Sequence, residues 1–173
     1  MGKASRYPSA VHFELRHDFD SPAPQVAAAL LDRGFQDSLD GLGPLKSREV
    51  LSQDSDAQGR VIRRVRCVLG IDMGAAAKFL GDSEPAWVEE AKWDPDQLLW
   101  SWVIHPEVAE QLLSASGTMA LQEQDGATTR LIKGRVDVRV PFYGGKVEGW
   151  IVKGISDAYE EEAGRLETYL ASR

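Results

Sequence analysis

Five polar side chains fall within apolar patterns of this sequence, and they are the groups that could do chemistry in a buried site. His17, Arg63 and Glu89 lie on predicted strand faces, and Tyr159 and Glu162 lie on a predicted C-terminal helix. Facing a cavity, these groups could orient the polar end of a ligand or act as acid and base. A buried charge needs a partner, water or a ligand, because burying it alone costs on the order of several kcal/mol or changes its protonation state.

A structural or solvated role is the default interpretation for each of these five residues. A bulge or a register slip of one residue turns a strand side chain to the opposite face of the sheet. Arg63 and Glu89 fall on consecutive strand segments, so the sequence also allows an ion pair between them.

The sequence contains five tryptophans, a large number for 173 residues. Their large apolar surface with a single N–H donor suits either the core or an aromatic ligand wall. Core packing is the default interpretation, and we place Trp100, Trp102 and Trp150 at a candidate ligand wall. Ile151 and Gly154 follow Trp150 on the same helix and join this candidate set. A glycine there could admit a close approach, leave room for a ligand or allow a bend.

Other chemistries have little support in the sequence. The three histidines, His12, His17 and His105, lack the close spacing of metal ligands. Cys67 is the single cysteine, which excludes an intrachain disulfide and disfavours a cysteine-based zinc site. No GxGxxG, P-loop or GxSxG motif occurs. We therefore expect no metal and no other cofactor.

Composition and charge limit the class of protein. Apolar residues make up 43% of the chain and charged residues 27%, as in ordinary globular proteins. The net charge of −7 disfavours nucleic acid and anionic membrane surfaces as partners. The N-terminal sequence MGKASRYPSA has no apolar run typical of a signal peptide, and no stretch is apolar for long enough to span a membrane. We expect a cytoplasmic protein with no integral membrane span.

Alternating and helical patterns divide the chain into elements. Residues 11–19 alternate as a strand, and Ser21 with Pro22 is typical of the N-cap and first position of a short helix. A second short helix is predicted over residues 34–39. Six strand patterns follow, at residues 47–53, 60–69, 87–93, 98–105, 116–124 and 128–140, with short helical or loop segments near residues 73–80 and 108–113.

The last predicted element is a long amphipathic helix over residues 144–171. Its apolar residues recur at spacings of three and four: Val147, Trp150, Ile151, Ile155, Ala158, Tyr159, Leu166, Tyr169 and Leu170. At about 1.5 Å per residue the helix would be about 40 Å long. Such a stripe needs a concave surface, which a curved antiparallel sheet supplies. A long run of strands with helices set apart predicts an α+β fold.

This order of elements resembles the helix-grip fold of the START-like (SRPBCC) superfamily. The segment VPFYGGKVE at residues 140–148 resembles the strand-to-helix junction of an uncharacterised bacterial subfamily, a domain of unknown function. The resemblance implies one domain over residues 1–173, with a curved seven-stranded antiparallel sheet gripping the C-terminal helix and two short helices after the first strand. Residues 1–10 are expected to be flexible. It also implies a cavity for lipids, sterols, polyketides or other apolar molecules, and the superfamily has no universal catalytic motif to carry over.

Three functions are compatible with these observations. The first, which we favour, is binding or transport of a small apolar or amphipathic ligand between sheet and helix. The second is a cyclase-like or hydrolase-like enzyme that uses the same cavity, with His17, Arg63, Glu89 or Tyr159 as acid–base or orienting groups. The third is an accessory domain whose cavity is filled by its own tryptophans. Convergent buried polar groups favour the enzyme, an open apolar cavity favours the carrier and a filled core favours the accessory domain. The identity of the ligand and the oligomeric state stay open.

Overall fold

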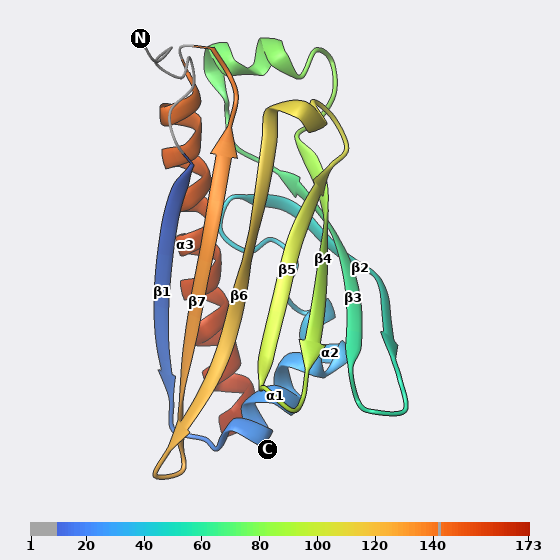
Figure 1. The fold of residues 1–173 in the computed structure, drawn as a ribbon, viewed down its shortest axis with the longest axis vertical. Helices are drawn as coiled ribbons and strands as arrows, with labels where there is room; N and C mark the ends of the chain where they lie inside the picture. Colours follow the sequence, from blue (N-terminus) through green and yellow to red (C-terminus); the bar gives the residue numbers. More distant parts are fainter. Residues whose placement is uncertain (1–9, 142) are drawn as a thin grey trace, which may run out of the picture.

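The computed structural model describes residues 10–141 and 143–173. The predicted flexible segment therefore lies outside the described residues except for residue 10, and so does Phe142 of the junction. Seven strands form one antiparallel sheet in the order β1-β7-β6-β5-β4-β3-β2 (Figure 1). Their bounds are β1 (Val11–Phe19), β2 (Leu45–Ser55), β3 (Val61–Leu69), β4 (Ala86–Asp94), β5 (Leu99–Pro106), β6 (Leu113–Gln124) and β7 (Ala127–Val138).

The helices cover one face and the two ends of this sheet. Their bounds are α1 (Ala23–Leu31), α2 (Arg33–Asp37) and α3 (Gly144–Ala171), with 3₁₀ segments η1 (Gly74–Phe79) and η2 (Glu110–Leu112). Figure 1 shows α3 running along the sheet, with α1 and α2 at one end of the molecule and η1 at the other. The predicted α+β helix-grip arrangement is confirmed. None of the described helices combines the length and apolar composition needed to cross a membrane.

The alternation of the strands fixes which side chains face α3. Inward-facing residues of β7 include Ile132 and Val136, which are fully buried, and α3 contributes Val147, Ala163 and Leu166 to the same core. The predicted turn between β6 and β7 is also confirmed. Asp125 and Gly126 have φ of 54° and 80°, the two positive angles that a type I′ hairpin requires.

The predicted N-cap of α1 was wrong. Pro22 occupies the N-cap position with extended backbone (φ −66°, ψ 152°), and the helix begins at Ala23. The free amide of Ala23 donates instead to Glu123 Oε2 on β6, at 2.8 Å. The cap therefore comes from a residue distant in sequence, because the hairpin end of β6 lies beside the start of α1.

A row of four residues across β1, β7, β6 and β5 controls the shape of the inner face. Phe13 pairs with Gly134, Gly134 with Gly117, and Gly117 with Trp102. The two rings lean over the two glycines from either side, with 6.4 Å between ring centroids. A Cβ on Gly117 would lie 2.5 Å from Trp102 Cζ2, so the glycines make room for these aromatic side chains.

The three interior glycines of α3 differ in their surroundings, and this difference gives a first prediction. A Cβ on Gly149 or Gly164 would meet no atom within 4 Å, whereas a Cβ on Gly154 would lie 2.9 Å from Pro44 Cγ. Replacing Gly149 or Gly164 with alanine should raise the free energy of unfolding by about 0.5–1 kcal/mol.

The same change at Gly154 should lower the free energy of unfolding by about 1 kcal/mol, because the clash exceeds the gain in helix propensity. Urea denaturation of the three variants measures these differences. Equal stabilisation by all three would show that Gly154 is not required for the approach of Pro44.

Candidate functional site

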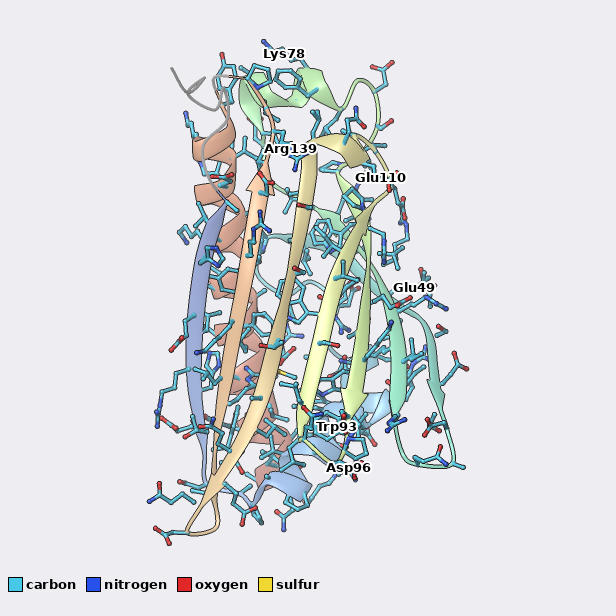
Figure 2. All side chains as sticks on the ribbon, in the orientation of Figure 1. Glu49, Lys78, Trp93, Asp96, Glu110 and Arg139 are labelled. Carbon is cyan, nitrogen blue, oxygen red and sulfur yellow. The ribbon has the colours of Figure 1, made fainter. Side chains whose placement is uncertain are left out.

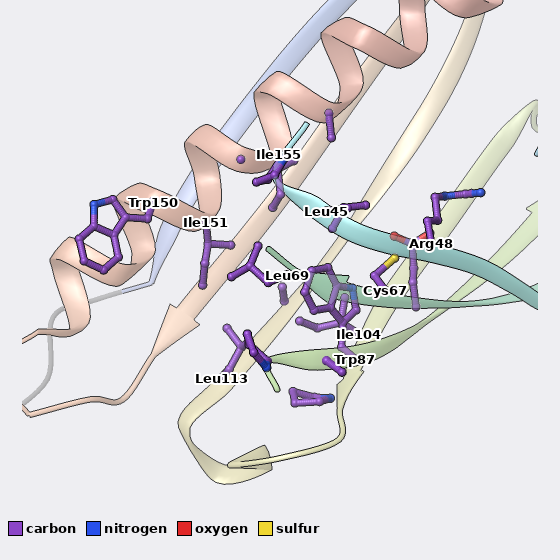
Figure 3. Close-up of a pocket in the computed structure, with 18 of the residues that line it drawn as sticks. Leu45, Arg48, Cys67, Leu69, Trp87, Ile104, Leu113, Trp150, Ile151 and Ile155 are labelled. Carbon is purple, nitrogen blue, oxygen red and sulfur yellow. The ribbon is translucent and has the colours of Figure 1, made fainter. Parts of the chain in front are cut away.

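A cavity of about 250 Å³ lies between α3 and the inner face of the sheet. Its wall is mainly apolar and comes from β3, β4, β5, α3 and the segments around η1 and η2. Figure 3 shows Ile151 and Ile155 of α3 facing Leu45, Leu69 and Leu113 across this space.

Almost all of the predicted site residues lie in the wall of this cavity. The residues that line it are Arg63, Glu89, Trp100, Trp102, Trp150, Ile151, Gly154, Tyr159 and Glu162. His17 is the exception, since it is buried between β1 and α3 and is not part of the lining. The lining of a cavity does not by itself establish a binding role, so the roles of these residues stay predictions.

Arg63 is the most deeply buried charge of the cavity wall, with 6% of its surface exposed. Its Nη1 donates to the carbonyl of Leu30 at 2.8 Å, and its Cζ lies 4.6 Å from the centroid of the Trp100 ring. Burial, and then the nearby Arg48, lower the pKa of Arg63 from 12.5 to about 10. The guanidinium is therefore charged at neutral pH.

Glu89 is the carboxyl on the strand next to this cation. Burial raises its pKa above 4.5, and the opposing attraction of Arg48 and Arg63 does not cancel that effect. The ion pair that the sequence allowed between Arg63 and Glu89 does not form, since the described side chains make no such contact within 4 Å. Arg63 pairs across the strands with Ala91 and Glu89 with Val65, so the two charges are diagonal neighbours.

A second polar cluster lies between β1, β7 and α3. Arg130 is fully buried, and its Nη1 forms an ion pair with Glu162 Oε1. Its Nη2 lies 3.2 Å from His17 Nδ1 and 3.3 Å from the carbonyl of Tyr159. His17 Nε2 lies 3.1 Å from Glu160 Oε1. This cluster connects Glu162, which lines the cavity, to the protein surface at Glu160.

The contacts assign the tautomer of His17. A guanidinium only donates, so Nδ1 must accept from Arg130, and Nε2 carries the proton that it donates to Glu160. Burial, and then the charge of Arg130, lower the pKa of His17 below 6.5. The imidazole is therefore neutral in the folded protein at neutral pH.

This lowered pKa predicts how stability depends on pH. Between the lowered pKa and 6.5 the unfolded chain binds more protons at His17 than the folded protein does, so the free energy of unfolding falls as the pH falls through that window. Replacing His17 with glutamine should remove the part of this fall in the free energy of unfolding that comes from protonation of His17. Thermal unfolding of both proteins from about pH 7.5 to about pH 5 measures the difference, with His105→Gln as an exposed control. Parallel pH curves for wild type and His17→Gln would contradict the assignment.

Several polar residues of this region were missed in the sequence. Arg130 was detectable, because it precedes Ile132 by two residues on the same strand. It therefore lies on the same inner face as Ile132 and Val136. Arg48 and Glu148 had no such signal. Glu148 is 1% exposed, and its Oε1 accepts a hydrogen bond from the amide of Val138 at 3.0 Å. Val138 lies on β7 just beyond Val136, where the described pairing of β7 with β1 ends. No group of three metal-binding side chains occurs among the described residues.

The long helix against a seven-stranded antiparallel sheet defines a START-like helix-grip (SRPBCC) fold. TTHA0849 from Thermus thermophilus is similar with a TM-score of 0.67 and 17% identity, over 94% of this chain and 98% of that one. The Zhui aromatase/cyclase from Streptomyces sp. R1128 is similar with a TM-score of 0.66 and 12% identity, over 95% of this chain and 96% of that one. A START superfamily protein from Mycobacterium smegmatis is similar with a TM-score of 0.58 and 11% identity, over 95% of this chain and 99% of that one.

The chain itself belongs to the family described as Protein of unknown function (DUF2505), which matches residues 14–170. This agrees with the resemblance of its strand-to-helix junction to a domain of unknown function. A search of curated proteins finds no match for the chain.

Proposed function

We propose that this protein binds one small apolar or amphipathic molecule in the cavity between the sheet and α3. The observation that carries the proposal is the cavity itself, about 250 Å³ of space with a mainly apolar wall and a few charged or hydroxyl groups. Such a combination is typical of small-molecule sites, where apolar contact gives affinity and few polar groups give orientation. The START-like fold supports the same proposal, because the resemblance to that superfamily implies a cavity for apolar molecules.

The tryptophans support an open cavity over a filled one. Trp93 and Trp100 pack on each other, with 5.5 Å between ring centroids, and Trp102 lies over Gly117. These rings occupy the sheet surface and leave the space next to α3 free. The accessory-domain alternative requires the rings to fill that space.

An enzyme that uses the same cavity is the second candidate, favoured by one observation. Glu89 is a cavity carboxyl with a raised pKa, a property common among catalytic acids and bases. The remaining groups fit this role less well. Burial raises the pKa of the Cys67 thiol to about 12, so it is not a thiolate nucleophile at neutral pH, and burial also raises the pKa of Tyr159.

The test is the binding of a neutral fluorescent reporter, N-phenyl-1-naphthylamine. Ile151 lines the cavity, whereas its neighbour Val152 is packed against the core without lining it. Replacing Ile151 with tryptophan should fill the space and lower reporter affinity by at least about tenfold, or 1.4 kcal/mol. Val152→Trp is the matched control and should bind within about twofold of wild type.

Two results would contradict the proposal. One is saturable reporter binding that Ile151→Trp leaves unchanged, which would place the reporter elsewhere. The other is no binding by the folded wild-type protein.

A further inference from the structure

Arg63 is a buried cation whose charge no side chain neutralises. It is 6% exposed, and among the described residues no carboxylate lies within 4 Å of its guanidinium. Nη1 donates to the Leu30 carbonyl, while Nε is buried with no hydrogen-bond partner. The Trp100 ring beneath it offers cation–π attraction but no negative charge. An unpaired buried charge of this kind is costly in a protein with no ligand.

The other charged groups of the cavity do not supply the missing anion. Glu162 is engaged by Arg130 in the second cluster. Glu89 makes no contact within 4 Å with the Arg63 guanidinium among the described side chains, and burial raises its pKa above 4.5. Arg48 adds a second positive charge to this wall, held by 2.8 and 2.7 Å hydrogen bonds to Gln36.

The polar groups lie toward one end of the cavity. In Figure 3, Arg48 and Cys67 lie at the end away from Trp150, and the wall between them is mainly apolar, with Leu69 and Trp87 among its side chains. Arg63 lies on the same face of β3 as Cys67, two steps of the strand alternation away. The cavity therefore has a cationic end and an apolar body.

We infer that the ligand is an amphipathic acid, with one carboxylate at the Arg63 end and an apolar body along the apolar wall of the cavity. This inference rests on the proposed function and adds the chemical class of the ligand. A guanidinium matches a carboxylate by two parallel N–H···O bonds, and the partnerless Nε is one of the donors that such a fork uses. Arg48 attracts the same anion at longer range.

The experiment compares ligands that differ only in their head group. Dodecanoic acid, dodecan-1-ol and dodecylamine each compete with the neutral reporter N-phenyl-1-naphthylamine at about pH 7.5, where Arg63 is charged. 2-Naphthoic acid and 2-naphthylmethanol repeat the comparison with a shorter, flat body. We expect each acid to bind at least about tenfold more tightly than its alcohol, and the amine to bind most weakly.

The variant arm locates the selectivity. Arg63→Met should weaken binding of the acids at least about tenfold and leave the alcohols within about twofold. Arg64→Met is the matched control, since Arg64 follows Arg63 on the opposite face and pairs with Glu90 at 2.8 Å. Arg64→Met should leave all affinities unchanged. Should Arg63→Met fail to fold, two measurements still test the inference. They are the ratio of acid affinity to alcohol affinity in the wild-type protein, and the same ratio in the Arg48→Met variant.

The outcomes separate this inference from the proposed function. If reporter and alcohols bind but the acids have no advantage in the wild-type protein, the inference is overturned and the binding function stands. If Arg63→Met weakens acids and alcohols equally, Arg63 is structural and the inference is again overturned. If neither the reporter nor any competitor binds, the proposed function itself fails.

Discussion

Replacing Arg130 with methionine is expected to lower the free energy of unfolding by about 3–5 kcal/mol, because removing one partner of a buried ion pair leaves the other uncompensated. Arg130 is fully buried and holds Glu162, His17 and the Tyr159 carbonyl together. Its Cζ also lies 5.4 Å from the centroid of the Phe19 ring. Methionine keeps much of the apolar stem and removes every one of these polar contacts.

Urea denaturation measures this loss, and two further variants interpret it. Arg135→Met changes an exposed arginine of the same strand and should alter stability by no more than about 0.5 kcal/mol. Adding Glu162→Gln to Arg130→Met should recover part of the loss, because the unpaired carboxylate causes much of it. A loss below about 1 kcal/mol for Arg130→Met would show that the cluster is not a structural link between β7 and α3.

Replacing Gly117 with alanine should lower the free energy of unfolding by about 3 kcal/mol, since the methyl group meets backbone and a rigid ring together. The added Cβ would overlap the Lys133 carbonyl and approach Trp102 Cζ2 to 2.5 Å. Trp102 lines the cavity, so a displaced indole should also weaken reporter binding in the same variant.

Ser116→Ala provides the control for this prediction. Ser116 precedes Gly117 on β6 and is exposed, so Ser116→Ala should change the free energy of unfolding by no more than about 0.5 kcal/mol. Full stability of Gly117→Ala, with unchanged reporter affinity, would show that the indole has room that the static packing does not reveal. Thermal unfolding and reporter titration of the same samples give both quantities.

Local pattern was sufficient to predict much of the fold. Strand alternation predicted the apolar strand faces and made Arg63, Trp100 and Trp102 candidates for the cavity wall, where they lie. The spacing of apolar residues predicted α3 over residues 144–171, as found. These features depend on neighbours within a few residues, where period and turn chemistry are readable.

The contacts that determine the site depend on residues far apart in the chain. The cap of α1 comes from Glu123, and the partner of His17 is Arg130, 113 residues away. Arg63 and Glu89 are diagonal neighbours because of the pairing register between β3 and β4. The order of the strands alone does not specify that register. The volume left beside α3 depends on how Trp102 packs over the two glycines, and no single segment encodes that packing.

The most direct test of a binding cavity is to observe its tryptophans while a ligand is added. Trp87, Trp100, Trp102 and Trp150 line the cavity, and Trp93 does not. Figure 2 places Trp93 near the end of the molecule that α1 and α2 cover. Each indole N–H gives one signal in a ¹⁵N–¹H spectrum, which tryptophan-to-phenylalanine variants can assign.

Titration with N-phenyl-1-naphthylamine should move the signals of Trp100 and Trp102 and saturate at one equivalent, while the signal of Trp93 changes least. Unchanged Trp100 and Trp102 signals, at ligand concentrations that shift other residues, would contradict the account, because the ligand would then bind outside the space between the sheet and α3.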